Sequence, residues 1–195
     1  MERIRLEIKR QPLHILLGLF LVVLIYHDLL TVPMLVAAIL AATIGSIFIR
    51  KTKPKEIYKA LSIVEREDDL KNMPGKGLIA YLVGALIALI LFKKEIAMAA
   101  MIILALGDSF SRLIGPFGKI KHPFNDARFL EGVIAGIAAA SLGAMLFVKP
   151  AEAITASFIT MLLEGIELKL FNHKIDDNIT IPLIAGVIIS IMRIL

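Results

Sequence analysis

Cysteine and tryptophan are absent from this chain of 195 residues, and glutamine occurs once. Without cysteine the protein can form neither disulfide bonds nor thiolate metal sites. The sequence also has no G-x-x-x-x-G-K-[ST] loop, no dinucleotide-binding fingerprint and no Ser-His-Asp catalytic arrangement. Any nucleotide must therefore be held by a site of another kind.

Hydrophobic residues make up 58% of the chain and the mean hydropathy is +0.83, against roughly 45–50% apolar residues in a typical soluble domain. They come in long blocks, which predicts an all-α, polytopic bundle of about seven transmembrane helices in a single domain, 1–195. Most blocks are shorter than the ~20 residues that cross a bilayer upright, so flanking Lys and Arg must reach the interface. The blocks are Leu13–Tyr26, Pro33–Ile49, Gly77–Phe92, Ile96–Ile114, Gly132–Val148, Ala151–Leu163 and Ile179–Leu195.

The first block is the weakest span. Leu13–Tyr26 is short, and only the tight connection 27–32 separates it from the second block. It is therefore either a membrane crossing or one half of a re-entrant pair, and the span count carries an uncertainty of about one.

Basic residues are unevenly shared between the two sides of the predicted bundle. Eighteen of the 22 Lys and Arg lie in the N-terminal segment and in alternate loops, and most Asp and Glu lie there too. The positive-inside rule makes this side cytoplasmic, with loops at 50–76, 115–131 and 171–178 and the N-terminus inside. We expect a multi-pass protein of the cell membrane whose active site faces the cytoplasm. The net charge of +5 follows from this topology and needs no nucleic-acid partner.

The strongest candidate for chemistry lies at the inner end of the fourth block. Gly107 and Asp108 lie near the inner end of this block, and the loop after it carries Gly115, Gly118 and two lysines, Lys119 and Lys121. A carboxylate at this depth is either an interfacial anchor or a functional group. Glycines and lysines in one loop suit a phosphate, although such a loop can also be a plain connector.

A second acidic group opens the next block. Glu131 follows Arg128 and precedes Gly132, so its carboxylate either favours the helix dipole or shares a divalent cation with Asp108. Oxygen ligands of this kind suit Mg²⁺. Gly132 also begins a GxxxG pattern that favours close helix packing.

Further polar residues lie at the ends of other blocks. Glu164 lies near membrane depth and needs a partner there. Asp176, Asp177 and Asn178 either cap the last helix or supply more metal ligands. His14 shares a helix face with Arg10 and Gly18, and Lys76 lies in a Gly-Lys-Gly turn that could contact phosphate.

The run GDSFSRLIGPFGKIKHPFNDARFLEG, residues 107–132, resembles the nucleotide-binding signature of the dolichol kinase, phytol kinase and CTP-dependent diacylglycerol kinase family. That family is related to the CDP-diacylglycerol synthases. Three further segments resemble family motifs in the same order, so the resemblance covers nearly the whole chain. They are 10–18, 65–77, and Glu164 followed by DDNITIPL at 176–183.

Four residues depart from the family pattern. Arg128-Phe129 stands where the family has Lys followed by Ser or Thr, Pro116 where a basic residue is common, and Arg112 where a small one is. A hydroxyl contact to phosphate is thereby lost, and Arg112 would replace the missing cation.

The resemblance implies a lipid kinase that uses CTP and Mg²⁺ to phosphorylate the hydroxyl of a polyprenol or of a diacyl- or dialkylglycerol. It implies Asp108, Glu131 and Asp177 as catalytic residues and Asp108, Glu131, Asp176 and Asp177 as metal ligands. The implied phosphate-binding residues are Gly107, Arg112, Gly115, Gly118, Lys119, Lys121, Arg128 and Gly132, with His14, Lys76, Glu164 and Asn178 as accessory residues.

Two alternatives remain open. One is a CTP-dependent cytidylyltransferase that makes a CDP-lipid from a lipid phosphate with the same ligands. The other is a non-catalytic membrane protein or transporter with an acidic inner vestibule. The oligomeric state, a homodimer included, is also open.

Overall fold

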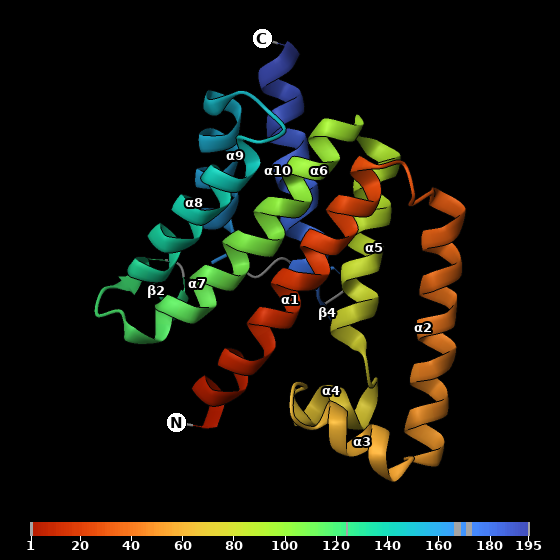
Figure 1. Ribbon diagram of the computed structural model, residues 1–195. Helices are drawn as coiled ribbons and strands as arrows, with labels where there is room; N and C mark the ends of the chain where they lie inside the picture. Colours follow the sequence, from red (N-terminus) through yellow and green to blue (C-terminus); the bar gives the residue numbers. More distant parts are fainter. Residues whose placement is uncertain (1, 124, 166–168, 171–172, 195) are drawn as a thin grey trace.

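The computed structural model describes residues 2–123, 125–165, 169–170 and 173–194 of the chain. Most of them belong to long helices that lie side by side, and the two termini lie at opposite ends of the bundle (Figure 1). The helices are α1 (Glu2–Tyr26), α2 (Val32–Thr52), α3 (Lys55–Leu61), α4 (Glu67–Asn72), α5 (Lys76–Leu91), α6 (Lys94–Ile102), the π-helical η1 (Ile103–Asp108), α7 (Ser109–Ile114), the 3₁₀-helical η2 (Gly115–Phe117), α8 (Leu130–Ala144), α9 (Pro150–Leu163) and α10 (Asp177–Ile194).

Among the residues that the structure describes, four helices are long and apolar enough to cross a membrane. They are Leu6–Tyr26, Val32–Thr52, the continuous Lys94–Phe117 and Asp177–Ile194. Three shorter apolar helices, α5, α8 and α9, lie among them and have 16, 15 and 14 residues. The structure therefore confirms a helical fold with membrane-spanning potential, while the count of seven crossings stays a prediction.

The first apolar block is longer as a helix than its sequence pattern suggests. Helix α1 begins at Glu2 and runs without interruption for 25 residues, with Pro12 inside it. Its apolar part, Leu6–Tyr26, is as long as α2. This length favours a full crossing over a re-entrant half-helix, because 21 residues at ~1.5 Å each approximate the hydrocarbon thickness.

The core is built around α6 and η1, in which every residue of the apolar stretch 96–105 is buried. Ala97, Ala99 and Ala100 are fully buried, as are Ile103 and Leu104 in η1. Helices α1, α5, α8 and α10 pack on this segment, and the small alanines let their backbones come close. By contrast α2 packs mainly on α5 and stands at the edge of the bundle (Figure 1).

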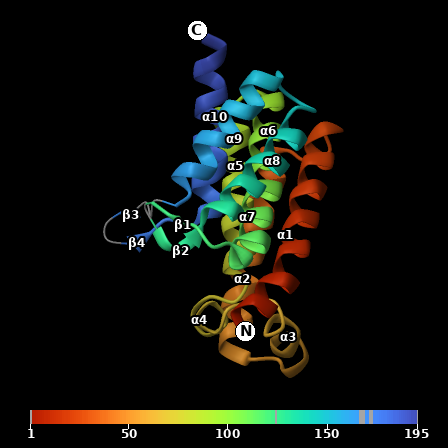
Figure 2. The same ribbon diagram turned by 90° about the vertical axis from the view of Figure 1, so that its left-hand side faces the viewer.

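Two short hairpins interrupt the helical pattern. Strand β1 (Lys121–His122) pairs antiparallel with β2 (Asn125–Phe129), and β3 (Lys169–Leu170) pairs with β4 (His173–Lys174). Both hairpins lie on the same side of the bundle (Figure 2). The sequence predicted plain loops here, because strands of two to five residues are too short to show alternation.

Candidate functional site

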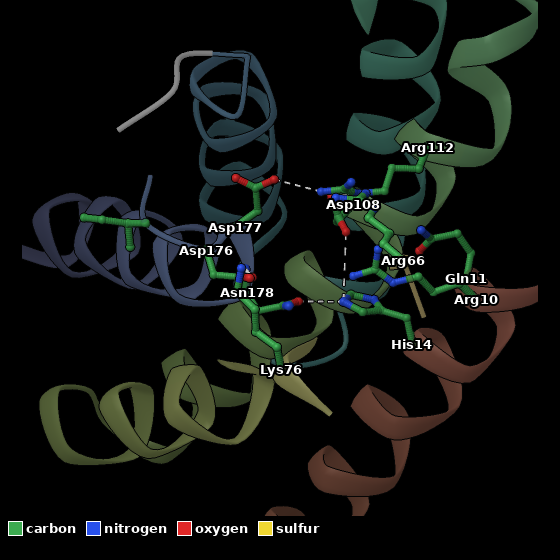
Figure 3. Close-up of a pocket in the computed structure, with 11 residues that line it drawn as sticks. Arg10, Gln11, His14, Arg66, Lys76, Asp108, Arg112, Asp176, Asp177 and Asn178 are labelled. Atoms are coloured by element: carbon green, nitrogen blue, oxygen red, sulfur yellow. Dashed lines mark hydrogen bonds and ion pairs between the residues drawn. The ribbon is translucent and has the colours of Figure 1, made fainter. Parts of the chain in front are cut away.

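Asp108 lies at the centre of the candidate site, at the point where the helix Lys94–Phe117 changes its winding. The π-helical turn η1 ends at Asp108, and the α-helix resumes at Ser109. Such wide turns inside α-helices occur frequently at functional sites. The Asp108 side chain is buried between α1 and the start of α10, facing His14 and Asp177 (Figure 3).

Two arginines link the carboxylates of the site. Arg112 donates from Nε to Asp108 Oδ1 at 2.6 Å and from Nη2 to Asp177 Oδ2 at 2.8 Å. Arg128 donates to Glu164 and, from Nη2 at 3.4 Å, to the same Asp177 oxygen. The network thus joins α7, β2, the end of α9 and the start of α10 through charge-assisted hydrogen bonds.

Three of these acids could hold a metal ion. Asp108, Glu164 and Asp177 each offer an oxygen, and the three atoms lie within 4.8 Å of one another. Carboxylate oxygens are ligands that suit Mg²⁺. The same three carboxylates accept hydrogen bonds from Arg112 and Arg128, so a bound cation would compete with these guanidinium groups.

Glu131, which was predicted to share a metal ion with Asp108, lies apart from this group of three acids. Its Oε1 accepts hydrogen bonds from the backbone N–H groups of Lys119 at 2.7 Å and Ile120 at 3.2 Å. The Lys119 N–H favours the ionised form and lowers the pKa of Glu131 below its usual value. Among the described residues, Glu131 is not part of the group that could share a metal ion, so its carboxylate instead anchors the loop after η2.

The predicted glycines lie at close helix contacts. A Cβ on Gly132 would lie 2.5 Å from the Ser111 carbonyl oxygen and 2.7 Å from the Gly115 Cα, so these two glycines let α8 approach the end of α7. A Cβ on Gly107 would meet Met161 at 2.7 Å, and one on Gly118 would meet the Glu131 carboxylate at 2.6 Å. These contacts explain the glycines by packing, and their predicted role in nucleotide binding stays a prediction.

A polar pocket of about 130 Å³ opens beside Asp108, and we call it the charged pocket (Figure 3). Four cationic side chains line it together with three carboxylates, and they come from α1, α5, η1, α7, the α3–α4 connection and the start of α10. The cations are Arg10, Arg66, Lys76 and Arg112, and the acids are Asp108, Asp176 and Asp177. Among the described residues, Lys119, Lys121 and Arg128 are not in its lining. Lys119 and Lys121 are exposed on the hairpin side.

His14 is held in place at the wall of this pocket. Its Nε2 lies 2.7 Å from Asn178 Oδ1 and 3.9 Å from Asp108 Oδ2, and its Nδ1 lies 3.2 Å from Ser109 Oγ. An amide oxygen only accepts hydrogen bonds, so Nε2 carries the proton in the neutral tautomer. The structure therefore brings the predicted accessory residues His14 and Asn178 together with Asp108.

Asp176 and Lys76 have structural partners as well as places in the lining. The Oδ1 atom of Asp176 accepts the backbone N–H of Asn178 at 3.0 Å, which fits the capping interpretation. Lys76 Nζ lies 3.4 Å from Asp69 Oδ1 at the entrance to α5. Asp176 is outside the three-acid group, in contrast to its predicted role as a metal ligand.

Sequence analysis missed Glu7, and it noted Gln11 and Arg66 only as parts of the family-like segments 10–18 and 65–77, without a role. The buried Glu7 accepts hydrogen bonds from Gln11 Nε2 at 2.6 Å and Arg66 Nη2 at 3.0 Å, and lies 3.8 Å from Arg10 Nη1. It thus holds two arginines at the charged pocket. The helical spacing of Glu7, Gln11 and His14 places them on one face of α1 and could have indicated this group.

No protein family model matches this chain, and no solved structure matches it. The chain is similar to an uncharacterized protein, MJ1137, of Methanocaldococcus jannaschii, with 28% identity over 187 residues. The aligned region covers 94% of this chain and 93% of the archaeal protein. The similarity therefore extends over almost the entire bundle, and the archaeal protein's name assigns no activity.

Proposed function

We propose that the protein is a membrane lipid kinase that transfers the γ-phosphoryl group of CTP, in the presence of Mg²⁺, to the hydroxyl of a polyprenol or of a diacyl- or dialkylglycerol. The observation that carries the proposal is the charged pocket, where four cations face three carboxylates. A nucleoside triphosphate needs cations around its phosphates and oxygen ligands for its metal. Phosphoryl transfer depends mainly on positioning and charge stabilisation, which such a lining supplies.

Each group of residues has a distinct proposed role. Asp108, Glu164 and Asp177 would hold Mg²⁺, which neutralises charge on the phosphates when it is bound. Arg112 and Arg128, which bind these carboxylates in the structure, would turn to the phosphates. The remaining cations of the lining, Arg10, Arg66 and Lys76, would contact the phosphates further from the metal ligands.

In the proposed step the oxygen of the lipid hydroxyl forms a bond to the γ-phosphorus. The bond between this phosphorus and the β–γ bridging oxygen breaks, and CDP leaves with that oxygen. The hydroxyl proton passes to a base at the charged pocket. The imidazole of His14, whose Nε2 lies 3.9 Å from Asp108 Oδ2, or one of the carboxylates of the pocket would take it.

The same proposal includes the topology and the location: the protein lies in the cell membrane and crosses it seven times, with its N-terminus in the cytoplasm. The two termini lie at opposite ends of the bundle (Figure 1), as an odd number of crossings requires. The basic residues gather on the side of the N-terminus, which supports a charged pocket facing the cytoplasm.

The natural absence of cysteine allows a direct test of this topology. Ser62→Cys in the α3–α4 connection should react with an impermeant thiol reagent only after the membrane is opened. Lys149→Cys before α9 should react in intact cells. Labelling of both positions from the same side would contradict the topology.

The reaction is tested with purified protein in liposomes that contain a total lipid extract. CTP labelled at the γ-phosphate should transfer its label to a lipid when Mg²⁺ is present. Transfer from CTP labelled at the α-phosphate would support the cytidylyltransferase alternative instead. Transfer of neither label would support the non-catalytic alternative.

A further inference from the structure

A second cavity of about 160 Å³ adjoins the charged pocket, and we call it the apolar groove. It lies between α1 and α5, under the connection from α3 to α4. Its apolar lining includes Leu13, Leu17, Leu78 and Tyr81. Leu13 and Leu78 are about half exposed, at 52% and 43%, so the groove has an open, apolar rim on the surface of two helices that the hydropathy pattern places in the membrane.

The inner end of the groove meets the charged pocket. Arg10, His14, Arg66 and Asn178 line both cavities, so a molecule can extend from the rim to the pocket past His14. The ring of His14 contacts that of Tyr81 edge to face, with centroids 4.7 Å apart. These two rings form the boundary between the apolar and the charged part.

The chemistry of the polar lining favours a neutral polar headgroup. Two cations and two carboxylates line the groove, so the charges of its polar lining balance; they are Arg10 and Arg66 with Glu65 and Asp69. The Tyr81 hydroxyl is buried and has no hydrogen-bond partner among the described residues. A buried hydroxyl of this kind costs free energy unless a ligand or water satisfies it.

The Tyr81 hydroxyl lies directly against the backbone of α1. Gly18 of α1 faces it, and a Cβ on Gly18 would lie 2.2 Å from the hydroxyl oxygen. The absence of a side chain at Gly18 therefore leaves room for Tyr81 to reach α1, and Tyr81 also lines the apolar groove beside His14.

We propose that the apolar groove binds a membrane lipid alcohol, with its hydrocarbon chain between α1 and α5 and its hydroxyl next to His14. The occupant must be amphipathic, because the rim is apolar while the polar lining is without net charge. This inference rests on the proposed kinase function for the fate of the hydroxyl. The groove as a binding site for a lipid alcohol can be tested without any transfer.

The binding test uses a long-chain prenol that carries a photoreactive diazirine in its chain, with the full-length protein in liposomes. After illumination the label should map to α1 around residues 13–17 and to α5 around residues 77–81. Excess unlabelled prenol should remove this labelling. Labelling confined to other helices, or removal by a prenyl phosphate at far lower concentration than by the prenol, would overturn the proposal.

The matched variants are Leu13→Trp and Leu16→Trp on the same helix. Leu13 lines the groove, whereas Leu16 is 62% exposed and lies outside the lining. Leu13→Trp should raise KM for the lipid acceptor about tenfold and leave KM for CTP within twofold. Leu16→Trp should change neither KM value. Equal effects of the two variants on the KM for the lipid acceptor would overturn the proposal that the groove binds the acceptor.

The two proposals fail in different ways. If the photoreactive prenol labels the groove but no phosphate is transferred from CTP, the groove stands and the kinase function fails. If phosphate is transferred but either the labelling pattern or the Leu13→Trp variant disagrees with the groove, the kinase function stands and this inference fails.

Discussion

Arg112 and Asp177 form an ion pair with an Nη2–Oδ2 distance of 2.8 Å, although 65 residues separate them in the chain. The same guanidinium binds Asp108 through Nε, so one side chain joins the helix that contains η1 to the start of α10. Arg112 stands where the resembled kinase family has a small residue. The geometry gives this departure a physical reason, because an arginine here can neutralise two carboxylates or bind a phosphate.

Replacement of Arg112 by lysine tests this bridging role. A lysine keeps the charge but cannot bind two carboxylates through a planar fork. We expect Arg112→Lys to lower kcat for CTP-dependent phosphorylation about tenfold and the free energy of unfolding by ~1–3 kcal/mol. The surface variant Arg50→Lys, which alters only a bond to the Asn72 carbonyl, should behave as the native protein. An unchanged kcat in Arg112→Lys would contradict the role.

We expect the Glu131 carboxylate to anchor the loop at Lys119 and Ile120 and not to bind the metal ion. Glu131→Gln keeps a carbonyl oxygen that can accept the Lys119 N–H, so we expect activity within about fivefold of the native value and an unchanged Mg²⁺ requirement. An increase of tenfold or more in the Mg²⁺ concentration for half-maximal activity would show instead that Glu131 is a metal ligand.

The lowered pKa of Glu131 predicts a pH dependence for the same loop. A depressed folded-state pKa contributes stability above the unfolded value of 4.5, and this contribution is lost as the pH falls through the folded-state pKa. Hydrogen exchange at the Lys119 and Ile120 amides should therefore be slow near neutral pH. Relative to the intrinsic exchange rate, protection should fall only below pH 4.5. Loss of protection between pH 6 and 8 would contradict this anchoring.

The contact between Gly132 and Gly115 should limit which residues are tolerated. A methyl group at Gly132 would overlap the Ser111 carbonyl oxygen, so we expect Gly132→Ala to destabilise the protein by ~1–3 kcal/mol. Gly45→Ala is the matched control, because a Cβ at Gly45 meets nothing within 4 Å. Thermal unfolding in detergent measures the melting temperature of each variant. Equal melting temperatures of Gly132→Ala and Gly45→Ala would contradict the close contact.

Glu7 should position the cations of the charged pocket without touching the reacting atoms. Glu7→Gln weakens its bond to Arg66, so we expect KM for CTP to rise about tenfold while kcat changes less than threefold. Glu67→Gln is the control, since the ion pair of Glu67 with Lys71 lies on the surface. A large loss in kcat with an unchanged KM would contradict a positioning role.

The helical fold could be predicted from the sequence because its cause is local. Long apolar blocks form helices wherever they lie, and every block overlaps a helix of the structure. The extension of α1 to Glu2 was missed because its first turns are charged. The two hairpins were missed because their pairing depends on tertiary packing and not on a repeating pattern.

The sequence motifs identified individual polar residues of the site, but they did not show which of these residues contact one another. Asp108, Asp177, His14 and Asn178 were singled out, and the structure brings them together. The partner of each carboxylate could not be predicted. Asp108 and Glu131 flank the same loop in the sequence, but Asp108 contacts Arg112 whereas Glu131 contacts the backbone of Lys119. Glu164 was placed as an accessory residue, whereas it lies with Asp108 and Asp177 in the three-acid group. The contacts of each carboxylate depend on how its helix is rotated about its axis, and the sequence pattern does not define this rotation.

The most direct measurement of the central claim is the transfer of γ-labelled phosphate from CTP to lipid by the native protein and by Asp108→Asn. Asp108→Asn removes a charge at the centre of the charged pocket while keeping the size of the side chain. We expect the native protein to label a lipid and the variant to do so at least about a hundredfold more slowly, with both proteins folded and embedded in liposomes. Equal rates for the two proteins, or label that reaches the lipid only from the α-phosphate, would contradict the account.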